Sequence, residues 1–120
     1  MNILPIFPVL QQSTEVVSVL GSRIYEDIAP PKTSYPYAVW SSIGGVPDNQ
    51  LADQPSIDHI SFQIVVYDEQ ATRASNIRKL IARILGEHCY VTGTHPNHYE
   101  RIADTDVFGR GFDGNWWLGR

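Results

Sequence analysis

Apolar and polar residues alternate most regularly between positions 60 and 66, where Ile, Phe, Ile and Val occupy every second position. This period of two predicts a strand with one buried face. From residue 69 to residue 85 the apolar residues follow a helical period, in a stripe that runs from Ala74 to Leu85. Asp68 is expected to cap this helix and Gly86 to end it. We expect this strand and this helix to pack together as the core of the fold.

Two short helices are predicted before this core. Pro5 and Pro8 can lie in the first turn of one helix, where the missing amide donor of proline does no harm. Ser13 or Thr14 can cap a second helix, which should end at Gly21 because glycine tolerates the backbone conformation that terminates helices.

Further strands are predicted from β-branched and aromatic residues, at positions 37–43, 89–92 and 98–105. Gly44 and Gly45 should end the first of these strands. The sequence Asp-Gly-Asn at 113–115 predicts a turn before the tryptophans near the end of the sequence.

The order of these elements predicts an α+β fold in a single domain over residues 1–120. We expect a small antiparallel sheet. The main helix, at about 69–85, and the short N-terminal helices should pack on one face of that sheet.

The segment 46–56 is polar and rich in turn-forming residues, and it predicts a long loop between two strands. Eleven residues are more than such a connection needs, and long loops in compact domains tend to be functional or disordered. We interpret this loop as an element that contacts a partner or lines a channel. Its candidate residues are Asp48, Asn49, Gln50, Leu51 and Asp53.

The composition narrows the class of protein. Hydrophobic residues make up 42% of the chain and charged residues 18%, which is typical of a globular protein. The net charge of −4 argues against a surface devoted to nucleic acid, because such surfaces are basic. Cys89 is the only cysteine, so no internal disulfide can form, which suits a reducing compartment. No apolar stretch is long enough to span a bilayer, and we expect a protein that is soluble and intracellular when made.

Three glycines match the G-x-G-x-x-G spacing of a dinucleotide-binding loop: Gly109, Gly111 and Gly114. That motif works only between a strand and a helix. Only six residues follow Gly114, too few for a helix and a second strand. We therefore expect these glycines to lie in hairpins and loops.

Metal-capable side chains cluster at His88, Cys89, His95 and His98, but their spacing fits no common zinc pattern. Surface histidines around a loop are the preferred interpretation, and a small metal-dependent hydrolase using His88, His95 and His98 is the alternative. The acidic residues Glu100, Asp104 and Asp106 could serve acid–base catalysis, although a polar strand end explains them equally well. We expect no metal, no cofactor and no catalytic residues.

The main helix carries four of the nine Lys and Arg residues: Arg73, Arg78, Lys79 and Arg83. Such a face could read a nucleic-acid groove, contact another subunit or simply be solvated. Because acidic residues dominate elsewhere, subunit contact or solvation is favoured.

Three runs together resemble the tail completion proteins of long-tailed bacteriophages, also described as tail terminator or head–tail joining proteins. They are Leu20-Gly21-Ser22-Arg23-Ile24-Tyr25, Ala29-Pro30 and Tyr35-Pro36-Tyr37-Ala38-Val39-Trp40. The order of elements in that family holds from about residue 4 to about residue 105. Family members usually finish with a longer amphipathic strand, from which this chain is expected to differ.

The resemblance implies a structural virion protein, made in the host cytoplasm, that is not an enzyme. It implies a homo-oligomeric ring, typically a hexamer, which caps the tail tube protein and receives the neck or head-completion protein. DNA would pass through a central channel without sequence-specific binding, and an acidic protein suits such a channel. A neighbouring head-completion or stopper ring protein is the alternative within this class, and the metal-dependent hydrolase is the alternative outside it.

Overall fold

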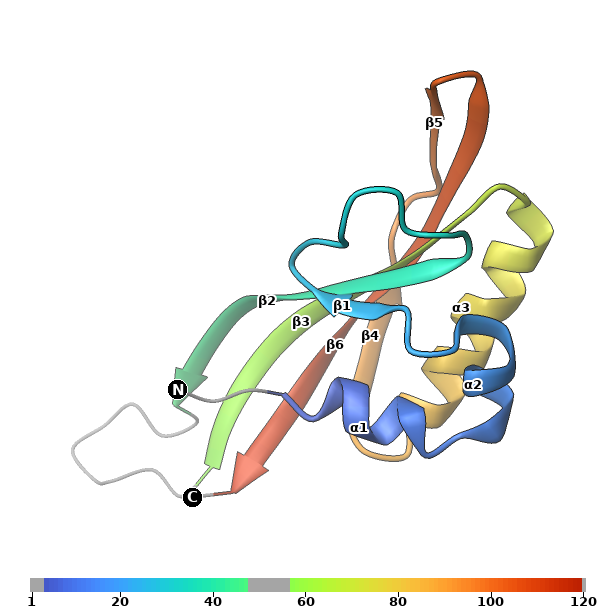
Figure 1. The fold of residues 1–120 in the computed structure, drawn as a ribbon. Helices are drawn as coiled ribbons and strands as arrows, with labels where there is room; N and C mark the ends of the chain where they lie inside the picture. Colours follow the sequence, from blue (N-terminus) through green and yellow to red (C-terminus); the bar gives the residue numbers. More distant parts are fainter. Residues whose placement is uncertain (1–3, 48–56, 120) are drawn as a thin grey trace.

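The computed structural model describes residues 4–47 and 57–119 (Figure 1). The elements, in chain order, are α1 (Ile6–Gln11), α2 (Thr14–Leu20), β1 (Ile24–Glu26), β2 (Tyr37–Pro47), β3 (Ile57–Asp68), α3 (Ala71–Leu85), β4 (Tyr90–Thr94), β5 (His98–Ile102) and β6 (Thr105–Gly119). The predicted α+β class is confirmed. Within these residues, no helix combines the length and apolar character needed to cross a membrane.

The strands form one sheet in the order β1-β2-β3-β6-β4, and β5 pairs with β6 beside β4. All pairs are antiparallel except β1 with β2, which are parallel. The predicted antiparallel sheet is therefore a mixed sheet with one parallel pair. The reason is β1, a three-residue strand that the periodicity did not reveal, followed by a connection at 27–36 that returns the chain to the same end of the sheet.

The predicted strands at 37–43 and 60–66 are confirmed, and both are longer than expected. β2 continues through Gly44 and Gly45 to Pro47, with a register shift between Ser42 and Gly44. A bulge of this kind lets a strand continue past residues that would otherwise end it. Residues 46 and 47 of the predicted loop thus belong to β2, and the candidate residues Asp48, Asn49, Gln50, Leu51 and Asp53 lie outside the described part of the chain.

β6 contains the largest difference from the sequence prediction. The predicted turn at 113–115 lies inside this fifteen-residue strand, where Asp113 pairs with Gln63 and Asn115 with Ser61. The Ser61 hydroxyl also donates a hydrogen bond to Asn115 Oδ1 at 2.9 Å. Pairing with β3 on one side and with β4 and β5 on the other overrides the local turn preference. The hairpin expected near residue 114 is therefore one long strand in the structure.

The glycines of the G-x-G-x-x-G pattern are strand residues and not hairpin or loop residues, which corrects the prediction. A Cβ atom at Gly111 would lie 2.7 Å from the carbonyl oxygen of Ile64, and one at Gly114 would lie 2.6 Å from Cζ of Phe62. Close approach of neighbouring chain is a common reason for glycine inside a strand.

The main helix starts two residues later than predicted. Its N-cap is Gln70, whose side chain makes no capping hydrogen bond, and its C-cap is Gly86, as expected. Asp68 does not cap the helix. Its buried carboxylate instead accepts hydrogen bonds from the Glu69 amide and from Arg73.

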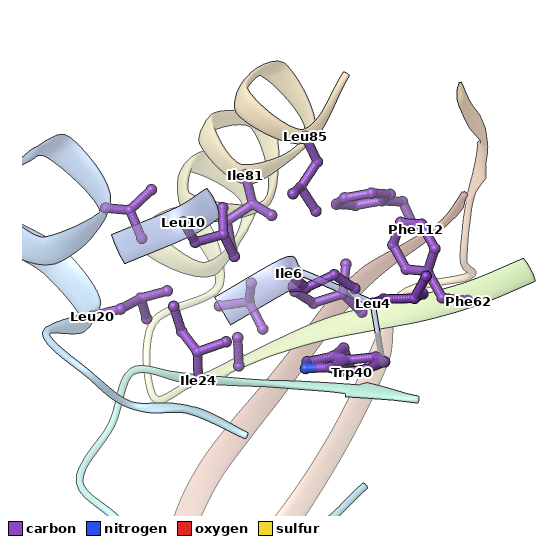
Figure 2. Packing of buried hydrophobic residues seen from close by; sticks show 14 of the residues in the cluster. Leu4, Ile6, Leu10, Leu20, Ile24, Trp40, Phe62, Ile81, Leu85 and Phe112 are labelled. Atoms are coloured by element: carbon purple, nitrogen blue, oxygen red, sulfur yellow. The ribbon is translucent and has the colours of Figure 1, made fainter. Parts of the chain in front are cut away.

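The core lies between the sheet and the helices, which cover one face of the sheet as predicted (Figure 1). Figure 2 shows Ile6 and Leu10 of α1 between Ile81 of α3 and the side chains of Phe62 and Trp40 from the sheet. In α2 the predicted caps are confirmed, since Ser13 accepts a hydrogen bond from the Val16 amide and Gly21 ends the helix at φ 57°. The strand–helix core that the periodicity predicted is thus present.

Candidate assembly surfaces

The four cations of α3 do not form one free basic face. Arg73 binds the buried Asp68 carboxylate at 2.6 Å, and Arg83 binds Glu15 of α2 at 2.9 Å, where both side chains are exposed. Arg78 is half-buried and Lys79 is exposed. Two of the four candidates therefore stabilise the subunit itself, and Arg78 and Lys79 remain as candidates for contact with another subunit.

The three histidines of the hydrolase alternative each have a different partner. His88 stacks on Trp116, with ring centroids 6.1 Å apart. His95 forms a short hydrogen bond with Asp113, and His98 lies 3.3 Å from Glu100. Residues 4–47 and 57–119 contain no group of three or more His, Cys, Asp or Glu side chains placed to hold a metal ion. The structure does not bring these histidines into one site.

Cys89 is a half-buried residue packed against the core. Burial raises the pKa of its thiol from the ordinary value of 9.0 to about 11. A thiol must ionise to act as a nucleophile, so at neutral pH this side chain behaves as a small apolar residue.

β5 and the first residues of β6 form a hairpin, here called the arm (residues 98–109). The predicted strand at 98–105 is broken in the structure by a two-residue turn, where Ala103 has φ 50° and Asp104 has φ 65°. Two successive positive φ values are the mark of a type I′ hairpin turn. In Figure 1 the arm projects beyond the helices and the rest of the sheet, and every residue of β5 is exposed.

The carboxylates on the arm have structural partners and do not converge. Asp106 accepts hydrogen bonds from the Tyr99 hydroxyl and from Arg101, each at 2.7 Å. The Tyr99 hydrogen bond, with Arg101 in support, holds the pKa of Asp106 below its usual value. Glu100 faces His98, and Asp104 is exposed in the turn. These contacts keep the two strands of the arm together and leave no acid–base pair.

The sheet has two different free edges. Among residues 4–47 and 57–119, β1 pairs only with β2 at one edge, and β4 and β5 pair only with β6 at the other edge. Both edges carry exposed large hydrophobic side chains. Ile28, just after β1, is 79% exposed, and the opposite edge exposes Tyr90, Val91, Tyr99 and Ile102. Free edges with exposed apolar residues are ready to pair with another chain.

A third surface lies on the face of the sheet away from the helices. Tyr35, Tyr37 and Tyr67 form a row, with adjacent ring centroids 5.5 and 5.4 Å apart. They border a hollow of about 500 Å³ whose other wall is the connection at 27–33. Desolvation by burial raises the pKa values of Tyr37 and Tyr67, so both hydroxyls stay neutral. This surface was not predicted from the sequence, although the tyrosines at 35 and 37, just before and at the start of the predicted strand, were a signal for it.

Comparisons with known proteins fit a virion protein. Among solved structures, a chain of the "Virion of native gene transfer agent (GTA) particle" is similar with a TM-score of 0.61 and 12% sequence identity, over 96% of this chain and 92% of that chain. That similarity concerns the fold. No curated protein matches the chain.

The sequence profile of the family described as "Tail completion protein gp17" matches residues 5–107. This match covers most of the chain, from α1 to the start of β6, and it confirms the resemblance drawn from the three sequence runs. The chain therefore belongs to the tail completion protein family, whose members are structural proteins of the phage virion and not enzymes.

Proposed function

We propose that this chain forms a homo-oligomeric ring that terminates the tail tube and joins it to the neck, with a central channel for DNA. The observation that supports this proposal best is the pair of different free edges on one sheet. A ring is built from heterologous contacts, in which one surface of each subunit binds a different surface of the next. An edge at β1 and another at β4 and β5 supply two such surfaces.

The arm gives further support. A two-stranded ribbon is marginally stable in water by itself, and three strands or a covering helix are normally needed. Beyond β4 the arm has two strands, and within the subunit Tyr99 and Ile102 stay 55% and 47% exposed. Contact with a neighbouring subunit would bury these side chains and stabilise the ribbon.

The net charge of the chain suits a channel through which DNA passes. A net charge of −4 disfavours tight binding of DNA in a channel. We propose that Asp48, Asn49, Gln50, Leu51 and Asp53 contact the tube or neck protein or line the channel, and that Arg78 and Lys79 contact an adjacent subunit. A head-completion or stopper ring would use the same two edges, and electron microscopy of assembled particles distinguishes the two positions.

The test measures the oligomeric state of the purified chain, alone and with isolated tails, by sedimentation velocity and negative-stain electron microscopy. We expect a ring in at least one condition. Ile102→Glu on the arm should abolish it and leave the melting temperature unchanged, because Ile102 is 47% exposed. Val17→Glu is the matched control, because Val17 is 40% exposed on α2 and away from both edges. A chain that stays monomeric in both conditions would contradict the ring.

A further inference from the structure

Arg110 is a buried cation at the base of the arm. It lies on β6 opposite Val66, and only 8% of its surface is exposed. Its guanidinium carbon is 5.6 Å from the centre of the Phe108 ring. Nη1 donates hydrogen bonds to the carbonyl oxygens of His98 at 3.1 Å and Gly109 at 3.0 Å. These bonds fix the guanidinium plane.

The other edge of this guanidinium has no acceptor. Nε is buried and unpaired within the described part of the chain, and the hydrogen bonds of Arg110 there all come from Nη1. Nε and Nη2 form the side of an arginine that grips a carboxylate through two parallel hydrogen bonds. Arg73 uses this same side on Asp68, with Nε and Nη2 each 2.6 Å from a carboxylate oxygen. In Arg110 the same fork has no anion among the described residues, and its Nε is covered by the subunit's own atoms.

The acidic residues nearest along the strands already have partners. Asp68, opposite Phe108, is held by Arg73 and the Glu69 amide. Asp106 is held by Tyr99 and Arg101, and Glu100 by His98. A buried charge without an opposite charge is unfavourable in an isolated subunit. The missing carboxylate is therefore expected to come from outside the subunit.

The opposite edge of the sheet offers such a carboxylate. Glu26 ends β1, and Asp27 follows it with φ 67° and an amide that donates to the Trp40 carbonyl oxygen at 2.8 Å. Both side chains are exposed, and neither forms an ion pair within residues 4–47 and 57–119. Ile28 beside them is the most exposed large hydrophobic residue among those described, at 79%. This edge is thus acidic and apolar, and the base of the arm is cationic and aromatic.

We propose that the end of β1 in one copy docks on the base of the arm in the next copy, so that Glu26 or Asp27 pairs with the Arg110 guanidinium as docking uncovers its Nε edge. This inference rests on the ring proposed above and specifies its subunit contact. Ile28 then packs on the aromatic side chains Tyr99 and Phe108, whose centroids are 5.3 Å apart. The contact joins two different surfaces, as closure of a ring requires.

The first experiment replaces Arg110 and measures subunit stability and ring assembly separately. Arg110→Met should leave the melting temperature of the subunit unchanged or higher, since it removes a buried unpaired charge. The same variant should weaken subunit association by about a hundredfold, because the carboxylate of the neighbour loses its partner. Arg110→Lys should recover part of the association, since it keeps the charge but not the fork. Arg83→Met is the matched control, because Arg83 pairs with Glu15 on the helices and not on the arm.

The second experiment locates the contact by disulfide cross-linking in a Cys89→Ser background. A chain with Ile28→Cys and Tyr99→Cys should give a ladder of linked multimers on mild oxidation, because each subunit links to two neighbours. Each single variant should give dimers at most, and Glu87→Cys with Tyr99→Cys should give no ladder.

The outcomes separate the two proposals. A ladder together with lost assembly in Arg110→Met supports this contact, and if Arg110→Met fails to fold, Arg110→Lys and the ladder decide. A ring that persists in Arg110→Met, without a ladder, overturns the contact and leaves the ring standing. If Arg110→Met still forms a ring that no longer joins the tube or the neck, the carboxylate that binds Arg110 belongs to another virion protein. That result also overturns the contact. A wild-type chain that never forms a ring overturns both.

Discussion

The ring of Phe62 on β3 lies directly over Gly114 on β6, so that a Cβ atom at position 114 would come within 2.6 Å of Phe62 Cζ. Phe62 is fully buried and also packs against Phe112 and Trp116. It therefore has little room to move. The carbonyl oxygen of Tyr90 would lie 3.0 Å from the same Cβ on the β4 side.

Gly114→Ala should destabilise the subunit by about 1–3 kcal/mol, because an added methyl group in a packed core forces its neighbours to shift. Gly93→Ala on β4 is the matched control, since a Cβ there meets nothing within 4 Å. Its expected change in the free energy of unfolding is within about 0.5 kcal/mol. Urea denaturation of both variants makes the comparison. Equal effects at the two positions would show that Phe62 moves aside freely.

The Asp68–Arg73 ion pair should matter far more to stability than the Arg83–Glu15 pair. Asp68 is fully buried, so Arg73→Gln leaves a buried carboxylate without its cation and should cost about 3 kcal/mol. Arg83→Gln removes an exposed pair and should cost less than about 1 kcal/mol. Thermal unfolding of the two variants checks this order. If Arg83→Gln proves the more harmful change, the structural role assigned to Arg73 is wrong.

A single substitution in the turn of the arm should make the arm more stable. Ala103 has φ 50°, a conformation that Asn and Gly adopt more readily than Ala. Ala103→Asn should therefore stabilise the arm by about 0.5–1 kcal/mol. The measurement is amide hydrogen exchange at residues 98–109, since local opening of the arm need not change the melting temperature. Ala82→Gly inside α3 is the control and should destabilise its helix by about 1 kcal/mol.

Cys89 should make the free energy of unfolding and the rate of thiol alkylation depend on pH. Between its ordinary pKa of 9.0 and the folded-state value of about 11, the unfolded thiol ionises while the folded thiol stays protonated. The unfolded state then binds fewer protons, so the free energy of unfolding falls as pH rises through this window. Iodoacetamide alkylation of the native protein should be slow at neutral pH and should keep accelerating up to about pH 11. Cys89→Ser removes this contribution, and an alkylation rate that levels off near pH 9 would contradict the shift.

The sequence predicted the elements whose period is uninterrupted. The strand around Ile64 and the helix around Ile77 each bury a regular stripe, and both are present with the expected faces inward. The caps of α2 could also be predicted from the sequence, because Ser13 and Gly21 act on backbone groups close to them in the chain. Such local and periodic signals do not depend on the rest of the fold.

The prediction was wrong where distant contacts override local preference. Asp113-Gly114-Asn115 favours a turn in isolation, but pairing with β3 and the overlying Phe62 ring keep it extended. Asp68 was predicted to cap α3 because it precedes this helix. In the structure its carboxylate is buried and binds Arg73 instead. Arg110 gave no signal at all, since nothing in a sequence tells a buried cation from a solvated one.

The continuity of β6 has a mechanical consequence. The strand that begins in the arm also runs through the interior of the sheet, where it pairs with β3 from Asp68↔Phe108 to Ile57↔Gly119. A pull on the arm along the strand loads these hydrogen bonds in shear, because antiparallel bonds lie perpendicular to the strand axis. Bonds loaded in this way must break together and not one after another. The subunit should therefore resist tension along the arm better than peeling at β1, whose three residue pairs can separate in turn.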